Sequence, residues 1–358
     1  MNLDDRLGIR QLDADHMLDR IEELPQQCAA AWEQCDQLRL PWEPDTFDQV
    51  ILAGMGGSAI GGALLQGLVA DECCIPLTVV RDYTLPAFAG GPNTLVVACS
   101  YSGNTEETLS CFKQAVARET AALAVTTGGK LSSLARRAGA PVVRFDYESQ
   151  PRAALGFSFT LLLGVAHQLG LIRDPSSDLA EGVEVMEAWQ SQLRIEVPKE
   201  QNEAKQMAAQ IHGALPVTYG AGFLGPVANR WKTQLNENAK HWAFFEILPE
   251  LNHNSVVGLG VPMDARDLAV VLLLRSSLDS PRIQERWDVT LELLTQEGVS
   301  AAAVKGRGES KLAQMLSLIH FGDYVSYYLA VCNEVDPTPV ENIRFLKRRL
   351  AELAGFAA

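Results

Sequence analysis

Short apolar runs alternate with helical patterns along most of this chain, and this alternation restricts the folds that it can adopt. In the first half, five runs have the length and composition of buried strands, at residues 49–53, 77–80, 94–99, 121–126 and 142–145. Helical patterns separate most of them, at residues 59–69, 106–117 and 131–138. A strand–helix–strand order places strands side by side in parallel, with helices on both faces of the sheet. The first half therefore predicts an α/β domain.

The second half repeats this order. Strands are expected at 217–219, 244–247, 267–274 and 301–304, and helices at 224–239, 283–296, 311–332 and 340–353. A shared order in the two halves favours two sheets of one type over a single large sheet. We expect a first domain at 1–152, connecting helices and a linker at 153–200, and a second domain at 201–358 that ends in a helix. An N-terminal helical segment at 13–34, expected to break near Pro25, belongs to the first domain.

The composition excludes several classes of protein. The 358 residues are 47% hydrophobic and 21% charged, which is typical of a globular enzyme with a substantial core. The net charge of −14 argues against a nucleic-acid partner, because there is no basic stripe to displace counterions. The seven cysteines are scattered and odd in number, and the acidic N-terminus lacks the apolar segment of a signal peptide. We therefore expect a cytoplasmic protein with reduced thiols.

One uncharged segment has the length of a membrane span. Residues 153–172 carry no formal charge over 20 residues, which is long enough to cross a bilayer. The surrounding pattern is that of a soluble α/β protein, so a helix buried between two domains is the favoured interpretation. We expect no membrane partner.

The stretch SYSGNTEET at 100–108 points most directly to a ligand. It joins the apolar run at 94–99 to a helical pattern, so Ser100, Ser102 and Thr105 lie on a strand-to-helix turn. Backbone N–H groups at the start of a helix, surrounded by small hydroxyl side chains, bind anions. The turn contains no Lys, which distinguishes it from a P-loop. It predicts a site for a small phosphate, such as that of a phosphosugar.

The glycine-rich turn GMGGSAIGG at 54–62 has two interpretations. It satisfies the loose dinucleotide fingerprint, and Asp82 at the end of the next strand is placed to bind a ribose. The additional Gly57 and Ser58, together with the hydroxyl-rich second turn, are better suited to a monophosphate. Both turns follow predicted neighbouring parallel strands, whose carboxyl ends form the usual ligand-binding edge. A dinucleotide enzyme is the less favoured alternative.

Together with later motifs, these two turns resemble the bifunctional phosphoglucose/phosphomannose isomerase family, which is built from sugar-isomerase (SIS) domains. The later motifs are QPRAALG at 150–156, QLNENAK at 234–240, LPELNHN at 248–254 and the tail IRFLK at 343–347. They cover nearly the whole chain in the family order. The resemblance implies an α/β fold with two SIS-type domains, each a parallel sheet flanked by helices. It also implies a homodimer with shared active sites, and an enzyme of carbohydrate metabolism that converts glucose 6-phosphate or mannose 6-phosphate to fructose 6-phosphate.

The resemblance further implies roles for individual residues. Six small residues would bind the substrate, the phosphate being held by Ser100, Ser102 and Thr105 and the sugar site being lined by Gly56, Gly57 and Ser58. Arg152 would stabilise the enediolate, and Glu237 would be the base. His253 would open the sugar ring, assisted by Lys347. The family's His comes from the neighbouring subunit, so a complete site would need a dimer.

The chemistry of isomerisation suits these side chains, although each has a structural alternative. One carboxylate within reach of both carbons can carry a proton between C1 and C2 through a cis-enediol, and an imidazole that titrates near neutrality suits ring opening. Without the resemblance, Glu237 would be taken as a solvated helix residue and His253 as a loop residue bonded to the backbone. An Arg can stabilise a developing oxyanion, but Arg152 could instead pair with Asp146 or Glu148.

Lys347 is the weakest of the four assignments, and the choice between substrates is open. Lys347 stands in a Lys-Arg-Arg cluster near a helix end, where cations are favoured by the helix dipole in any case. Glucose and mannose phosphates differ at C2, and Thr338 in the segment DPTP is a candidate to place a hydroxyl there.

Neither a metal nor a cofactor is expected, and one different class of function is open. The His and Cys residues lack the spacing of a metal site, and an enediol route through Glu needs neither metal nor cofactor. SIS domains also serve as non-catalytic sugar-phosphate sensors, because fold does not determine function. Such a regulator would keep the phosphate loop but has no need of Glu237, His253 and Arg152.

Overall fold

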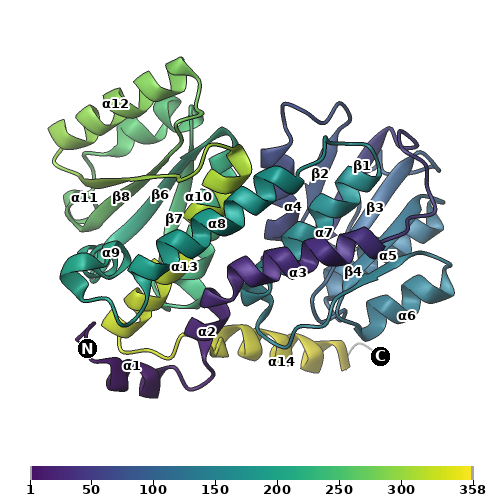
Figure 1. Cartoon of the computed structure of the whole chain (residues 1–358), viewed down its shortest axis with the longest axis horizontal. Helices are drawn as coiled ribbons and strands as arrows, with labels where there is room; N and C mark the ends of the chain where they lie inside the picture. The colour runs from purple at the N-terminus through teal and green to yellow at the C-terminus, as the bar shows by residue number, and fades with distance from the viewer. Residues whose placement is uncertain (1, 356–358) are drawn as a thin grey trace.

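The computed structural model describes residues 2–355 and contains two parallel sheets with a layer of long helices between them (Figure 1). Sheet A has the strand order β2-β1-β3-β4-β5, and sheet B has the order β7-β6-β8-β9. Every neighbouring pair of strands is parallel. The strands are β1 (Gln49–Gly54), β2 (Leu77–Val80), β3 (Thr94–Cys99), β4 (Ala121–Thr126), β5 (Val142–Arg144), β6 (Leu215–Ala221), β7 (Phe244–Leu248), β8 (Ala269–Arg275) and β9 (Ser300–Lys305).

Helices alternate with these strands and also fill the centre of the molecule. The α-helices are α1 (Arg6–Leu12), α2 (Met17–Glu22), α3 (Leu24–Gln37), α4 (Gly56–Leu68), α5 (Glu106–Ala117), α6 (Gly129–Arg137), α7 (Leu155–Gln168), α8 (Ser176–Leu193), α9 (Glu203–Ile211), α10 (Gly225–Glu237), α11 (Met263–Leu268), α12 (Pro281–Gln296), α13 (Lys311–Cys332) and α14 (Glu341–Gly355). Short 3₁₀ turns are η1 (Pro151–Ala153), η2 (Lys199–Gln201), η3 (Gly222–Leu224), η4 (Glu250–His253) and η5 (Ser255–Gly258). Helix α13 packs against α8, α9 and α10, while α7 packs against α3 and α4.

Both faces of the inner strands are buried, as in β1, β3, β4 and β8, which explains why these strands are continuous apolar runs rather than alternating ones. In β3, Leu95 and Val97 face a central core that lies between the sheets, whereas Val96 and Ala98 face an outer core that they share with Phe112 of α5. A second outer core surrounds Trp287 of α12 beyond sheet B. The central core contains residues from both sheets, so the two halves of the chain share one apolar interior.

The α/β class with two parallel sheets is confirmed, and the differences from expectation are local. Helix α4 starts at Gly56, three residues before the expected start, so its glycines belong to the first helical turn. The expected break near Pro25 is confirmed: α2 ends at Glu22 and α3 begins at Leu24. Pro25 lies in the first turn of α3, where its missing N–H has no helical partner. Residues 267 and 268 end α11 instead of starting β8. The proposed domain limits, 1–152, 153–200 and 201–358, stay a prediction.

The uncharged segment at 153–172 begins at the last residue of the turn η1 and forms the buried helix α7. Helix α7 lies against α3 and α4, and most of its side chains are enclosed. Within residues 2–355, none of the helices has both the length and the apolar character that a bilayer crossing requires.

Candidate active site

The two small-residue turns meet at the carboxyl edge of sheet A. Strands β1 and β3 are neighbours, with Gly54 in register with Cys99, so the turns that follow them start side by side. The first turn leads into α4, and the Ser58 hydroxyl accepts a hydrogen bond of 3.1 Å from the backbone N–H of Tyr101 in the second turn. The adjacency predicted from sequence is thus present in the structure.

The second turn presents hydroxyl groups at the start of α5. The Ser100 and Thr105 hydroxyls are 2.9 Å apart, and the Ser102 hydroxyl accepts from the backbone N–H of Asn104. Thr105 is the N-cap residue of α5, but its side chain makes no hydrogen bond to the first turn. The backbone N–H groups of that turn therefore stay available, as an anion site requires.

Gly57 brings the first turn directly against η1. A Cβ atom at this position would lie 2.9 Å from the carbonyl carbon and oxygen of Pro151, and 3.0 Å from the backbone N of Arg152. Backbone atoms cannot move aside as a flexible side chain can, so only glycine permits this approach. The contact joins the loops of sheet A to Arg152.

The guanidinium of Arg152 is buried and held by the second half of the chain. Its Nε donates to Asn238 Oδ1 at 2.7 Å, and its Nη2 donates to the carbonyls of Pro337 and Thr338, both at 2.8 Å. Its Nη1 lies 3.5 Å from Glu237 Oε2. The expected alternative, a pair with Asp146 or Glu148, is absent from the described residues. Burial lowers the pKa of Arg152, but an Arg keeps its charge at neutral pH.

Glu237 is the last residue of α10, and its side chain is 27% exposed. It lines a pocket of about 630 Å³ between the end of α10, the segment at 335–340 and the first turn of α14. Lys240 lines the same pocket, and its Nζ donates to the carbonyls of Glu237 and Pro337. Burial, and next the charge of Arg152, lower the pKa of Lys240 to about 8. A partly exposed carboxylate thus faces one buried cation and one cation that titrates near neutral pH.

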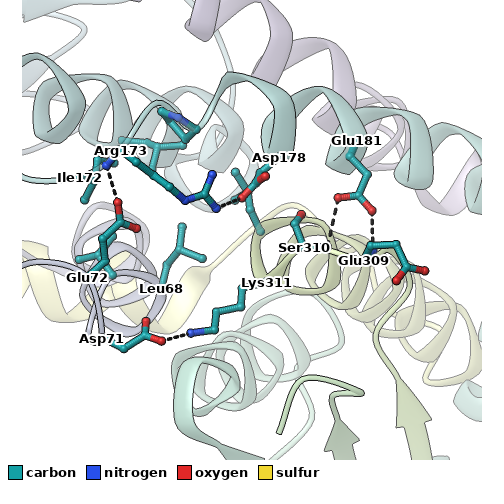
Figure 2. A pocket seen from close by; sticks show the side chains of 14 residues that line it. Leu68, Asp71, Glu72, Ile172, Arg173, Asp178, Glu181, Glu309, Ser310 and Lys311 are labelled. Atoms are coloured by element: carbon teal, nitrogen blue, oxygen red, sulfur yellow. Dashed lines mark hydrogen bonds and ion pairs between the residues drawn. The ribbon is translucent and has the colours of Figure 1, made fainter.

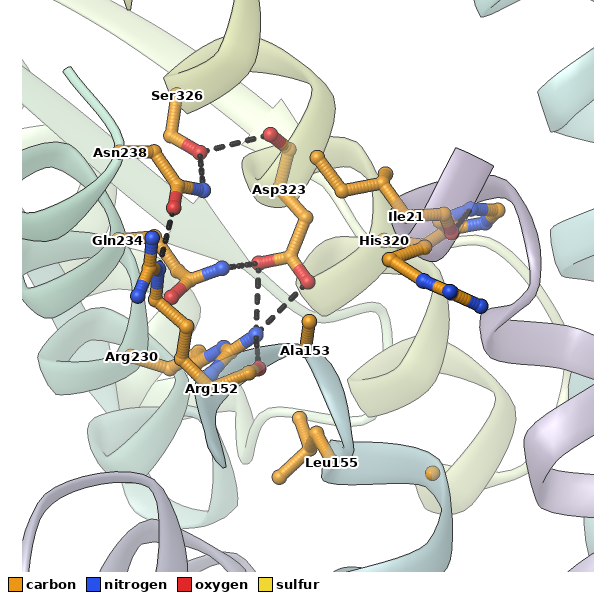
Figure 3. Close-up of polar contacts among 12 residues, drawn as sticks. Ile21, Arg152, Ala153, Leu155, Arg230, Gln234, Asn238, His320, Asp323 and Ser326 are labelled. Atoms are coloured by element: carbon orange, nitrogen blue, oxygen red, sulfur yellow. Dashed lines mark hydrogen bonds and ion pairs between the residues drawn. The ribbon is translucent and has the colours of Figure 1, made fainter. Parts of the chain in front are cut away.

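A buried polar network behind Arg152 was not anticipated from sequence (Figure 3). Arg230 and Gln234 of α10 and the residue that caps its C-terminus, Asn238, occur at intervals of four, so they lie on one helical face. Arg230 and Gln234 donate to the Asp323 carboxylate of α13, and Arg230 also donates to the Arg152 carbonyl. One signal was available: Asp323 interrupts the apolar pattern of the helix predicted at 311–332.

The structure does not bring two of the predicted catalytic residues to this pair. His253 is exposed at the end of η4, and it makes no hydrogen bond or ion pair within residues 2–355. Lys347 is exposed on α14, beyond the turn that borders the pocket. Thr338, in contrast, is 3% exposed beside Arg152, and its hydroxyl has no partner among the described residues. One chain therefore brings together the two loops, Arg152 and Glu237, but neither His253 nor Lys347.

A second pocket, of about 600 Å³, lies where α4, α8 and α13 approach one another (Figure 2). Both of its cations are already paired within the chain. Lys311 binds Asp71, and Arg173 binds Asp178. The Glu181 carboxylate accepts from the backbone N–H groups of Glu309 and Ser310 at the start of α13. These pairs leave no unpaired cation among the residues that line the pocket. Among the residues that the structure describes, no three His, Cys, Asp or Glu side chains are grouped to hold a metal ion.

Comparison with known proteins places this architecture. Two parallel sheets flanked by helices, with small-residue turns at the carboxyl edge, are the fold of the SIS proteins. The structure superposes on tagatose-6-phosphate ketose/aldose isomerase of Escherichia coli with a TM-score of 0.73. The two chains are 16% identical, and the superposition covers 90% of this chain and 95% of that one. Residues 200–350 match the family described as the bacterial phospho-glucose isomerase C-terminal SIS domain.

Two curated relatives narrow the assignment further. The chain is 41% identical to a bifunctional phosphoglucose/phosphomannose isomerase of Caldicellulosiruptor bescii, over 94% of this chain and 99% of the relative. It is 37% identical to the enzyme of that name from Aquifex aeolicus, over 86% of this chain and 92% of the relative. The chain belongs to the bifunctional phosphoglucose/phosphomannose isomerase family.

Proposed function

We propose that the protein is an intramolecular oxidoreductase that converts glucose 6-phosphate and mannose 6-phosphate to fructose 6-phosphate. Family membership supports the reaction. The observation that supports the roles of individual residues is the ion pair between Arg152 and Glu237 beside the two loops. A carboxylate and a buried guanidinium at one place are what proton transfer through an enediolate needs. A non-catalytic sensor has no use for that pair.

The reaction follows from the roles of these groups. The phosphate is held by Ser100, Ser102, Thr105 and the start of α5, with Gly56, Gly57 and Ser58 beside the sugar. His253, with Lys347 as its helper, protonates the ring oxygen as the bond between C1 and that oxygen breaks, while the C1 hydroxyl loses its proton to water and becomes the aldehyde of the open chain. Glu237 then removes the proton from C2, and the electron pair forms the C1–C2 double bond while charge develops on the C1 oxygen near Arg152. Return of the proton to C1 and movement of the C2 hydroxyl proton to the C1 oxygen yield the ketose.

Discrimination between the two aldoses would depend on groups near C2. Thr338 has a buried hydroxyl without a partner among the described residues, next to the guanidinium that faces the enediolate. We propose that this hydroxyl contacts the sugar where glucose and mannose phosphates differ.

We further propose a cytoplasmic homodimer with shared active sites. All seven cysteines are free thiols, as suits a reducing compartment. His253 is exposed and makes no contact with Glu237 of its own chain, which supports a His supplied by the partner. Helix α14 also leaves an apolar stripe exposed at three- and four-residue intervals, formed by Ile343, Leu346, Leu350 and Leu353. Such a stripe is typical of a surface that a second subunit covers.

The reaction is tested with a panel of phosphosugars in deuterated water, following both product and exchange at C1 and C2. We expect the wild-type protein to convert both aldoses and to exchange the transferred hydrogen. Glu237→Gln should lower kcat by about 10²–10⁴-fold while phosphosugar binding persists, because only the proton carrier is lost. Binding without exchange in the wild-type protein would identify a sensor, and normal turnover in the variant would exclude Glu237 as the base.

Shared sites are tested by mixing two inactive variants. In a dimer of Glu237→Gln and His253→Ala subunits, one of the two sites receives a wild-type Glu from one chain and a wild-type His from the other. Random exchange of subunits should therefore restore about a quarter of wild-type activity. Sedimentation confirms that the mixture is dimeric. If both residues acted from the same chain, mixing would restore no activity.

A further inference from the structure

The hydrogen bonds of Arg152 leave one side of its guanidinium free. A guanidinium has five N–H donors in a rigid planar fork. Three of them are used by the protein, one by Asn238 Oδ1 and two by the carbonyls of Pro337 and Thr338. Within residues 2–355, the two N–H groups of Nη1 have no hydrogen-bond acceptor, and Nη1 is the atom nearest to Glu237. The bonds on the other two nitrogens therefore decide which donors a substrate meets.

Asn238 is the only side chain among these three acceptors, and its own orientation is determined by α13. Its Nδ2 donates to the Ser326 hydroxyl at 2.9 Å, and that hydroxyl donates to the Asp323 carbonyl at 2.7 Å (Figure 3). A carbonyl can only accept, so the Ser326 proton is committed to Asp323. The Ser326 oxygen must then accept from the Asn238 amide nitrogen, which turns Oδ1 of Asn238 toward Arg152.

The chemical type of this acceptor also matters. An amide oxygen orients the guanidinium without adding a negative charge. The nearby Asp323 carboxylate is instead paired with Arg230 at 2.8 Å. Glu237 is therefore the one carboxylate, among the described residues, that forms an ion pair with Arg152. The positive charge stays available for an oxyanion that forms during the reaction.

We infer that Asn238 is a positioning residue that, through Ser326 and the backbone of α13, aims Nη1 of Arg152 at the enediolate. This inference rests on the proposed isomerisation and adds a determinant of its rate. Asn238 is fully buried and touches no substrate; it acts through Arg152. Misplacement of a catalytic group by about 1 Å can cost on the order of 10²-fold in rate.

The first test is the kinetics of Asn238→Ala and Ser326→Ala. Asn238→Ala should lower kcat by about 10–100-fold, and Ser326→Ala by about 3–10-fold, because the serine change removes only the bond that orients the amide. KM should change less than about threefold in both, since the phosphate loop is intact. Binding of an enediolate-mimicking phosphosugar hydroxamate should weaken by the same factor as kcat/KM, whereas binding of inorganic phosphate should not change.

A matched control separates positioning from loss of stability. Ser317 lies on the same helix as Ser326, is equally buried, and makes the same type of backward bond, to the Gln314 carbonyl, but has no link to Arg152. Ser317→Ala should leave kcat unchanged while lowering the unfolding midpoint at least as much as Ser326→Ala. If Ser317→Ala lowered kcat as strongly as Ser326→Ala, the inference would be wrong.

The deciding measurement is a double-mutant cycle with Arg152→Ala. If Asn238 acts through Arg152, adding Asn238→Ala to the Arg152→Ala protein should reduce kcat by less than about twofold. An equal loss in both backgrounds, with an active wild type, would overturn the inference alone. A wild-type protein that converts no phosphosugar would instead refute the proposed function, and the inference with it.

Discussion

At the scale of single residues, the site depends on contacts that tolerate no added atoms. Gly57 carries no catalytic group, but a methyl group there would meet the backbone of Pro151 and Arg152. The glycine-rich turn thus has a second role besides close approach to a ligand, because its contact with η1 determines the position of the Arg152 backbone. Sequence alone associated Gly57 with the sugar and gave no indication of this packing.

Lys240 predicts a pH dependence. Its lowered pKa, about 8, means that the side chain is positive below that pH and neutral above it. The positive charge favours a negative enediolate in the pocket that it shares with Glu237, so kcat/KM should fall as the pH rises through about 8. In Lys240→Arg, the side chain keeps its charge because the Arg pKa exceeds about 12, and this decline should disappear.

A pH profile between roughly pH 7 and 10 measures this effect, and comparison with Lys240→Arg separates it from ordinary His and Cys side chains, whose pKa values are about 6.5 and 8.5. Lys232→Arg, on α10 and outside the pocket, is the control and should keep the wild-type profile. An unchanged decline in Lys240→Arg would show that another group titrates.

At the scale of elements, the features that could be predicted are those encoded by residues adjacent in the sequence. The strands and the two turns of sheet A follow from runs of adjacent residues, so both loops were placed correctly. The pairing of Arg152 with Glu237 joins distant segments, and no spacing in the sequence reveals it without the family resemblance. The chain of hydrogen bonds from Ser326 through Asn238 to Arg152 depends on which group donates and which accepts at each step, and on how α10 packs against α13. Residue types alone predict neither.

Helix packing predicts opposite effects for two glycines, Gly322 of α13, which faces α10, and Gly61 of α4, which faces α7. In Gly322→Ala, the new Cβ would overlap the buried Trp231 ring, whose indole N–H is already bonded to the Leu318 carbonyl. Overpacking of this kind should cost about 1–3 kcal/mol in the free energy of unfolding. In Gly61→Ala, the Cβ would lie 3.5 Å from Phe159, an ordinary contact, and the higher helix propensity of Ala should stabilise by up to about 1 kcal/mol.

Urea unfolding of the two variants beside the wild-type protein provides the measurement. The sign of the difference is the test, since both changes add a single methyl group to a helix. Stabilisation by Gly322→Ala would mean that α10 and α13 are farther apart than described.

At the scale of the whole molecule, two sheets share one interior. The central core draws side chains from both sheets, since Val97 of β3 and Leu272 of β8 belong to the same cluster. Because the two small-residue turns follow strands of sheet A and Glu237 ends α10, which follows β6 of sheet B, the proposed activity requires both sheets in place. The chain therefore has two separate sheets, but the apolar core between them is shared and does not divide into two parts.

This shared core predicts one cooperative unfolding transition. Activity, far-UV circular dichroism and tryptophan fluorescence should all be lost at the same denaturant midpoint, because neither sheet keeps a complete core when the other unfolds. Trp32 of α3 reports on the central core, and Trp287 of α12 reports on the outer core beyond sheet B. Two separated transitions, with activity lost in the first, would show that the sheets fold independently.

The anchors of Arg152 also bear on how the enzyme tolerates genetic change. Two of its three acceptors are main-chain carbonyls, of Pro337 and Thr338, which every amino acid provides. A substitution there removes neither acceptor so long as the backbone keeps its path, which the bond from the Thr338 N–H to Asp336 Oδ1 supports. Sequence drift in this segment should therefore be nearly silent for the orientation of the guanidinium, and the vulnerability to mutation is concentrated in Asn238.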